Sequence, residues 1–439
     1  MKKAISGWGN YPKRVSILKN FDSTQELEKQ INNPKSTIAR GLGRSYGDAS
    51  LSPNIISTLK LNNILSFNDS KGLIKVESGI SVEDLLKFIV PRGWFMPVTA
   101  GTKFITLGGA IASNIHGKNH HKEGSIIQFV NELEIVTGPE KIITCSPTKN
   151  SDLFYSSFGG MGLTGIITKV ELRLKKIETS FISQTTIKSK NLNETIDLFI
   201  KNKSVTYSVA WIDCLAKGEK LGRGVFLMGE HAKKSELDSN REPLQTFNKT
   251  ILNFPLFLPS FFLNKITISL FNFCYYNLRK EKDSSITDYD SFFYPLDKVT
   301  NWNRAYGKKG FIQYQFVLPL TKAEILHEIL VKVAKSGQAS FLAVLKIFGK
   351  EENYLSFPME GFTLAMDFPV RESVFELIKE LDEIIHKHGG RIYLTKDSIM
   401  KEQYMKKGYP LLPKFLGIVE KYTKGEFKSD LSERLGIRI

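Results

Sequence analysis

The feature of this sequence that most restricts its fold is a set of three glycine-rich loops in the first 166 residues. The loops are ARGLGRSYGD at 39–48, GTKFITLGGAIASNIHG at 101–117 and GGMGLTGI at 159–166. Glycine lets a backbone approach a ligand closely, and consecutive N–H groups in such a loop can bind an anion. Because strand-like and helix-like segments join the three loops, we interpret them together as one ligand-binding site.

The first two loops differ in how they would bind a phosphate. Gly41, Gly43 and Gly47 give G-x-G-x-x-x-G, which is one residue too long for the Rossmann fingerprint, and no long helix follows. In the second loop, Thr106 is a candidate N-cap before the Gly108-Gly109 pair. A pyrophosphate is therefore expected at the positive end of the helix that begins there.

Local patterns predict alternating short strands and helices up to about residue 175. Ser23 and Ser81 each begin a capping pattern, the first before a short helix and the second before VEDLLKFIV, which Pro91 and Gly93 end. In IITKVELRLKK, apolar and charged residues alternate, as expected of a half-buried strand.

The second half of the chain has a different pattern. Aromatic, β-branched runs such as GFIQYQFVLPL and FTLAMDFPV predict strands, and amphipathic helices are expected at 321–336 and 372–388. A chain of 439 residues is long enough for two domains. We therefore predict an α+β protein of two domains, with an antiparallel sheet in the second.

The charge and the cysteines limit the function classes. The net charge is +16, from 61 Lys+Arg against 45 Asp+Glu, which suits an anionic membrane, a phosphorylated substrate or simply a lysine-rich proteome. No nucleic-acid-binding motif accompanies it, so no nucleic-acid partner is expected. The three cysteines form no C-x-x-C pair, and no apolar run follows the two N-terminal lysines. We expect a cytoplasmic protein without a signal peptide.

One apolar segment, 251–280, has two interpretations. Pro255, Pro259 and Lys265 interrupt it, so it does not resemble a transmembrane helix. It is either a buried hairpin of the second domain or an exposed loop that contacts an anionic bilayer, with Lys249, Arg279, Lys280 and Lys282 beside it.

The string IASNIHGKNHH at 111–121 contains three of the seven histidines. A metal site, a catalytic base and a basic loop are the three possible interpretations. Glu123 is the only acid close by, so no metal site is predicted.

Together these motifs resemble a known family. R-G-x-G-x-S in the first loop and G-G-x-x-A-x-x-x-H-G in the second resemble the flavin-binding domain of the vanillyl-alcohol oxidase / p-cresol methylhydroxylase superfamily. The strings HGKNHH, YSVAW, QYQFV, LKIFG, DFP and YLTKDS resemble, in order, the family of flavoprotein oxidase subunits of decaprenylphosphoryl-β-D-ribose 2′-epimerase. The resemblance implies an FAD-binding domain at 1–177, a substrate or cap domain at 178–390 and a C-terminal segment, 391–439, that returns to the first domain.

The resemblance also implies the cofactor site. Bound FAD would be non-covalent, because Arg44 occupies the position of the histidine that bonds the flavin in covalent members. The expected contacts are Ala39, Arg40, Gly41, Leu42, Gly43, Arg44, Ser45, Tyr46, Gly47, Asp48, Ala49, Gly101, Thr106, Leu107, Gly108, Gly109, Ser113, Asn114, Ile115, His116, Ile166 or Ile167, Tyr393 and Lys396. Among the histidines, His116 would face the flavin ring and the substrate, while Lys118, His120 and His121 would frame the cleft.

The implied reaction is oxidation of the 2′-hydroxyl of a polyprenyl-phosphoryl pentose to a keto sugar. The expected catalytic residues are His116, Lys346, Lys396 and Gln315, with Lys396 a candidate base if burial lowers its pKa. The expected substrate contacts are Tyr46, Trp211, Gln313, Gln315, Lys346, Phe348, Thr363 and Ala365. The partners would be a separate NAD(P)H-dependent reductase, which completes the epimerisation, and a membrane surface that the protein contacts peripherally.

The chain departs from the family at two substrate positions. Ala365 stands where the mycobacterial members have a cysteine, and Thr363 where the family has asparagine. These departures leave the exact sugar open. Two alternatives to the polyprenyl-phosphate sugar oxidase also stay open: an aldonolactone or alditol oxidase acting on free sugars, and a non-catalytic basic scaffold that binds a membrane or nucleic acid.

Overall fold

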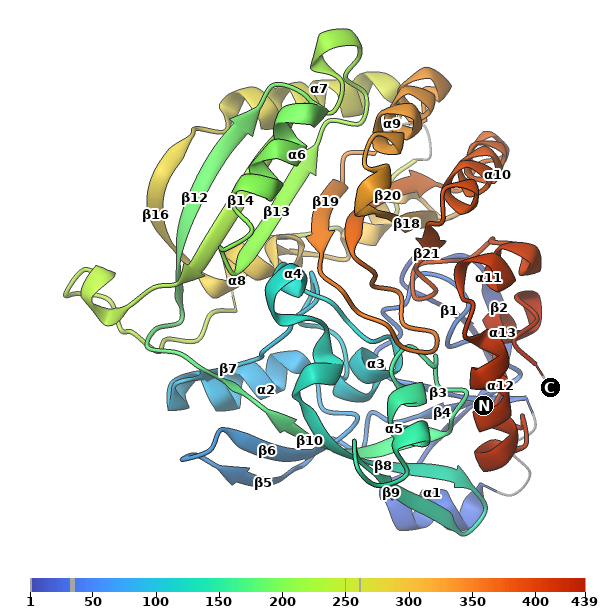
Figure 1. Ribbon diagram of the computed structural model, residues 1–439. Helices are drawn as coiled ribbons and strands as arrows, with labels where there is room; N and C mark the ends of the chain where they lie inside the picture. The colour runs from blue at the N-terminus through green and yellow to red at the C-terminus, as the bar shows by residue number, and fades with distance from the viewer. Residues whose placement is uncertain (1, 32–35, 249, 260–261, 339, 439) are drawn as a thin grey trace.

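The N-terminal part of the chain forms two sheets (Figure 1). The computed structural model describes residues 2–31, 36–248, 250–259, 262–338 and 340–438. A mixed sheet has the order β1-β2-β4-β3, with β1 at Lys2–Ser6, β2 at Lys13–Asn20, β3 at Thr37–Arg40 and β4 at Asn54–Ser57. An antiparallel sheet has the order β5-β6-β10-β8-β9, with β5 at Ile64–Asn68, β6 at Leu73–Glu77, β8 at Val130–Gly138, β9 at Lys141–Cys145 and β10 at Ile166–Arg173.

Three helices of this part begin at the predicted caps. Ser23 accepts from the N–H of Glu26 before α1 (Thr24–Gln30), and Ser81 accepts from Asp84 before α2 (Val82–Ile89). Thr106 Oγ1 accepts from the N–H of Gly109 at 3.3 Å before α3 (Leu107–Ala112). Each cap supplies an acceptor to an N–H group that the first helical turn leaves unpaired.

An antiparallel sheet of eight strands dominates the second half, in the upper part of Figure 1. Its order is β16-β12-β14-β13-β19-β20-β18-β21. The strands are β12 Phe181–Ser189, β13 Tyr207–Ile212, β14 Gly224–His231, β16 Lys282–Asp288, β18 Phe311–Pro319, β19 Ala343–Phe348, β20 Gly361–Pro369 and β21 Arg391–Ile392. The predicted α+β class and the antiparallel sheet in the second half are confirmed.

Because side chains alternate along a strand, the two faces of this sheet carry different residues: one face packs in the core and the other lines a cavity. In β18, Tyr314 and Phe316 belong to the apolar core that also includes residues of α6 (Leu192–Lys201), α9 (Ile325–Ser336) and α10 (Glu372–Lys387). Gln313 and Gln315 of the same strand line a cavity on the opposite face. The helix expected at 321–336 begins only at Ile325, since Leu320–Lys322 form a 3-10 turn.

The end of the chain returns to the N-terminal sheets. After β21 follow α11 (Glu402–Gly408), α12 (Leu412–Thr423) and α13 (Asp430–Arg434), which Figure 1 shows in red beside β1 and β2. The N–H of Lys428 donates to Thr37 O at 3.0 Å, and the N–H of Asp430 donates to Leu51 O at 2.8 Å. The domain boundaries at 177 and 390 stay predictions.

The remaining elements connect these sheets. They are β7 (Trp94–Phe95) paired with β11 (Lys175–Lys176), β15 (Leu252–Asn253) paired with β17 (Val299–Thr300), and the helices α4 (His120–Glu123), α5 (Ser151–Ser157), α7 (Lys265–Leu278) and α8 (Tyr289–Phe293). Among the described helices, none is both long enough and apolar enough to cross a membrane.

Candidate active site

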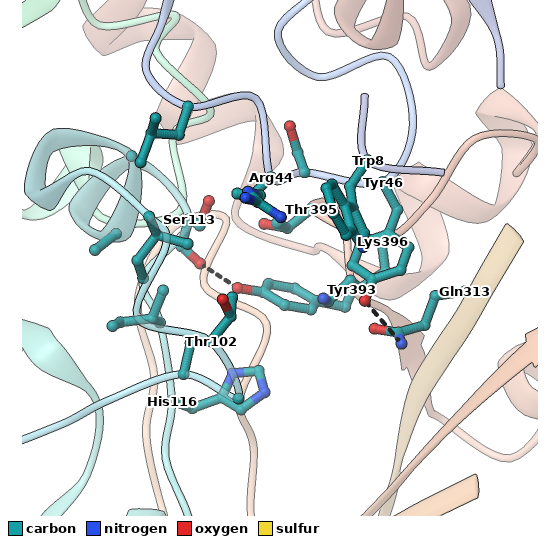
Figure 2. A pocket seen from close by; sticks show the side chains of 18 of the residues that line it. Trp8, Arg44, Tyr46, Thr102, Ser113, His116, Gln313, Tyr393, Thr395 and Lys396 are labelled. Atoms are coloured by element: carbon teal, nitrogen blue, oxygen red, sulfur yellow. Dashed lines mark hydrogen bonds between the residues drawn. The ribbon is translucent and has the colours of Figure 1, made fainter. Parts of the chain in front are cut away.

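The glycine-rich loops and the eight-stranded sheet enclose a cavity of about 420 Å³ (Figure 2). Most of the expected site residues line it, although they come from positions as far apart as 39 and 396. These are Ala39, Arg40, Gly41, Leu42, Gly43, Arg44, Ser45, Tyr46, Ala49, Gly101, Thr106, Gly108, Gly109, Ser113, Ile115, His116, Ile167, Trp211, Gln313, Gln315, Lys346, Ala365, Tyr393 and Lys396.

The first glycine-rich loop lines this cavity with residues 41–45. Within the part of the chain that the structure describes, the N–H groups of 41–45 donate to no protein acceptor. Gly43 adopts φ +65°, and a Cβ there would lie 2.0 Å from the Arg40 guanidinium. Arg40 in turn donates to Ser50 Oγ at 2.8 Å and to Ser6 O at 2.7 Å. Consecutive free N–H groups form an anion-binding nest.

The second glycine-rich loop packs tightly against the first. A Cβ at Gly41 would lie 2.1 Å from Thr106 Oγ1, so the two loops approach each other only because residue 41 has no side chain. The first N–H groups of α3 already have acceptors: Leu107 donates to Ile80 O, Gly108 to Ser78 O and Gly109 to Thr106 Oγ1. These three N–H groups are therefore already paired, whereas those of 41–45 are not paired within the described chain. A pyrophosphate at this helix end stays a prediction.

Lys396 lies beside a buried network of hydrogen-bonded side chains. Its ammonium is 3.8 Å from the centre of the Tyr46 ring. Figure 2 shows the two side chains next to each other. Gln313 Nε2 donates to Tyr46 Oη at 3.3 Å and to Asp367 Oδ1 at 2.6 Å. Burial lowers the pKa of Lys396, and the Asp367 carboxylate opposes that shift. Burial also raises the pKa of Asp367, so this lysine can lose its proton well below pH 10.5.

His116 is held in an aromatic enclosure. Its ring centre lies 4.7 Å from that of Phe348, 5.5 Å from Phe357 and 5.0 Å from Tyr393. Gln315 Nε2 lies 3.1 Å from His116 Nε2, whereas His116 Nδ1 has no partner in the described part of the chain. Burial lowers the pKa of His116 well below 6.5. A neutral imidazole that accepts from Gln315 carries its proton on Nδ1, where it can donate to a ligand.

Six cationic side chains line the cavity, against one described carboxylate, that of Asp297. Lys118 was assigned from sequence only to the frame of the cleft, but it lines the cavity, as does Arg279, which was expected beside the apolar segment. Burial lowers the pKa of Lys118 to about 7 and that of Lys346 to about 8. The cations are Arg40, Arg44, Lys118, Arg279, Lys346 and Lys396. Such a cavity favours an anionic ligand.

A buried network behind His116 was not predicted. Asn114, which adopts φ +40°, donates to Glu351 Oε1 at 2.7 Å and to Ser356 Oγ at 2.6 Å. Glu351 also accepts from Ser125 Oγ at 2.7 Å and lies 3.3 Å from His120 Nε2. The network joins the histidine-containing loop to the segment after β19. No local pattern marked Glu351, because its partners Asn114 and Ser125 are more than 200 residues away.

Some expected contacts do not reach the cavity. Phe348 lies behind His116, in ring contact with His120 at 4.5 Å, and Thr363 lies behind Gln315, from which its hydroxyl accepts at 3.2 Å. Ile166 packs into a core cluster, so Ile167 is the residue of that pair that faces the cavity. Gly47, Asp48, Leu107 and Asn114 also lie outside the lining.

The three histidines have separate environments. His120 is buried and lies beside Glu351, whereas His121 Nε2 is 2.8 Å from Val205 O. No group of three or more metal-ligating side chains is present among the described residues.

Comparisons with known proteins agree with this geometry. Residues 12–146 match the FAD binding domain family. The decaprenylphosphoryl-β-D-ribose oxidase of Mycolicibacterium smegmatis (strain ATCC 700084 / mc(2)155) is 34% identical over 447 residues, which cover 99% of this chain and 97% of that protein. The D-lactate dehydrogenase of Anaerostipes hadrus is 31% identical over 42% of this chain and 41% of its own. Cytokinin dehydrogenase 9 of Oryza sativa subsp. japonica is 34% identical over 32% of this chain and 28% of its own.

The fold, the cavity and these matches define an FAD-linked oxidoreductase. The chain belongs to the family of the decaprenylphosphoryl-β-D-ribose oxidase, as its motifs predicted.

The Glu351 network predicts a large loss of stability on its removal. Glu351→Ala leaves several buried donors without an acceptor, so we expect the free energy of unfolding to fall by about 3–5 kcal/mol. The neighbouring Glu352 is exposed, and Glu352→Ala should change it by less than about 0.5 kcal/mol. Urea titration of both variants measures the difference, and equal values would contradict the role given to the network.

Proposed function

We propose that the protein binds FAD non-covalently and oxidises the 2′-hydroxyl of a polyprenyl-phosphoryl pentose to a keto sugar. The observation that carries the proposal is the cavity itself, which is lined by the unpaired N–H loop 41–45 and by Lys118, Lys346 and Lys396. The name of the M. smegmatis relative supports the substrate class.

The residues present fit the cofactor. The five free N–H groups of 41–45 would bind its pyrophosphate, and Gly41 and Gly43 leave no side chain in that space. Arg44 lies at the position that would carry a covalent flavin link, with its guanidinium 3.9 Å from the Trp8 ring centre. A guanidinium held in this way supports non-covalent binding. When bound, FAD supplies a two-electron acceptor for the hydride of the oxidised carbon.

The chain's own residues supply the proton chemistry and the binding of the substrate. Lys396, as the neutral amine, would accept the hydroxyl proton, and Asp367 would set how readily the lysine becomes neutral. His116 Nδ1 and the amides of Gln313 and Gln315 would orient the sugar hydroxyls. Lys118 and Lys346 would attract the phosphate of the substrate. A separate NAD(P)H-dependent reductase would then reduce the keto sugar.

The substrate class is tested by anaerobic bleaching of the flavin. We expect the purified protein to be yellow, and a polyprenyl-phosphoryl pentose to bleach it while the free pentose does not, because the free sugar lacks the anion that the lysines bind. Absorbance in a stopped-flow instrument measures the rate for each sugar. Bleaching by free sugars alone would favour an aldonolactone or alditol oxidase, and a colourless protein would favour a non-catalytic scaffold.

The role of Lys396 predicts a defined pH dependence. The neutral amine forms as the pH rises, so the rate of flavin reduction should rise with pH and level off well below the ordinary lysine value of 10.5. Because the Asp367 carboxylate stabilises the ammonium, Asp367→Asn should move the midpoint to lower pH.

The matched control for this profile is Glu360→Gln, which alters an exposed carboxylate directly before the first residue of β20. It should leave the midpoint unchanged. A rate that falls as the pH rises, or a midpoint that Asp367→Asn moves upward, would contradict a base role for Lys396.

A further inference from the structure

The segment 251–278 exposes most of the large apolar side chains on the surface of the described chain. Ten of the eighteen large apolar residues with high exposure belong to it, and the other eight are scattered from residue 15 to residue 200. The ten are Ile251, Leu252, Leu256, Phe257, Phe262, Ile266, Leu270, Phe271, Phe273 and Leu278. Residues 260–261 of the segment, and the flanking Lys249, lie outside the described residues. The buried hairpin considered from sequence is therefore wrong for the residues described.

Helix α7 reverses the usual polarity of a surface helix. Ile266, Leu270 and Phe273 are 79%, 63% and 57% exposed and share one face, whereas Asn272 is fully buried and donates to Asp213 Oδ1 at 2.8 Å. A surface helix normally exposes its polar residues and buries its apolar ones. An apolar face of this kind marks an interaction site.

The C-terminal end of the same helix, with Arg279 as the residue directly after it, reaches the active-site cavity. Tyr275 and Arg279 line the cavity, and the Tyr275 ring lies 4.6 Å from that of Trp211, another lining residue. Helix α7 thus carries the exposed apolar face and also reaches the cavity. Figure 1 shows α7 at the end of the molecule opposite to α1 and β9.

The charge around this face fits an anionic surface. Between residues 251 and 283 there are four cationic side chains, those of Lys265, Arg279, Lys280 and Lys282, against two acidic ones. All four cations are exposed, and within the described chain none of them forms an ion pair. Basic residues beside an apolar helix face are typical of helices that lie in the interface of an anionic bilayer.

We propose that the outer face of α7 rests on an anionic lipid bilayer, so that the cavity opens beside the membrane that holds the substrate's lipid. The proposal deepens the proposed function and rests on it for the origin of the substrate. The polyprenyl chain would stay in the bilayer while the sugar phosphate passes the C-terminal end of α7 at Tyr275 and Arg279.

The test is co-sedimentation of the full-length holoprotein with vesicles. The wild-type protein should sediment with vesicles of phosphatidylglycerol and phosphatidylcholine, and much less with phosphatidylcholine alone. The triple variant Ile266→Asn, Leu270→Asn, Phe273→Asn should lower the partition coefficient at least about tenfold, since it removes three inserted apolar side chains. Lys280→Glu with Lys282→Glu should weaken binding to the anionic vesicles only.

A matched control replaces three exposed apolar residues elsewhere. Val15→Asn, Leu65→Asn and Ile142→Asn together should leave vesicle binding unchanged, since these positions are exposed and belong to β2, β5 and β9, which Figure 1 shows away from α7. Bound flavin confirms that each variant is folded. Wild-type protein that does not sediment, or an α7 variant that binds like wild type, overturns the proposal. Loss of a dimer in the α7 variant, without any vesicle binding by wild type, would assign this face to a second copy of the chain and also overturns it.

These experiments distinguish a failure of membrane docking from a failure of catalysis. A short-chain, water-soluble polyprenyl-phosphoryl pentose should reduce the flavin of the α7 variant as fast as that of wild type, because none of its three positions lines the cavity. Vesicle binding without flavin reduction by any sugar would support docking and contradict the proposed function. Flavin reduction without vesicle binding would support the proposed function and contradict docking.

Discussion

Arg434 joins the first glycine-rich loop to the segment that carries Lys396. Its guanidinium donates to both carboxylate oxygens of Asp48, at 2.9 and 2.8 Å, and lies 2.9 Å from Asp397 Oδ2. Beside this contact the N–H of Tyr46 donates to Thr395 O at 3.0 Å, and a Cβ at Gly47 would lie 2.0 Å from Asp397 O. The amide nest and the candidate base are therefore fixed relative to each other, although about 350 residues separate them in sequence.

Side chains alternate between the two faces of the eight-stranded sheet, and one of these faces forms the substrate side of the site. One face carries the apolar residues that α6, α9 and α10 cover, so this face makes the sheet rigid. The opposite face places Gln313, Gln315 and Lys346 at the cavity. Groups held on packed strands keep their positions better than groups on loops, which suits a reaction that depends on the alignment of a C–H bond and a base.

Local sequence rules predicted the parts of this structure that local interactions determine. The caps at Ser23, Ser81 and Thr106, the strand alternation and the glycine-rich loops all follow from neighbours within a few residues. The donors of α3 could not be predicted to be occupied, since their acceptors Ile80 and Ser78 come from a different segment. The Glu351 network and the position of Phe348 behind His116 likewise depend on distant packing. Periodicity also did not show that α7 exposes its apolar face, because a pattern marks a face without saying what covers it.

The most direct test of this account is the substitution Arg434→Gln, with FAD affinity and flavin reduction measured on the same protein. Because one arginine holds both the nest and the Lys396 segment, the account predicts that both quantities fall together by about tenfold or more. Arg438→Gln is the control, since that guanidinium is exposed and lies 3.8 Å from Glu433. A folded Arg434→Gln protein that keeps its affinity for FAD, or that loses affinity while the bound flavin is reduced at the wild-type rate, would contradict it.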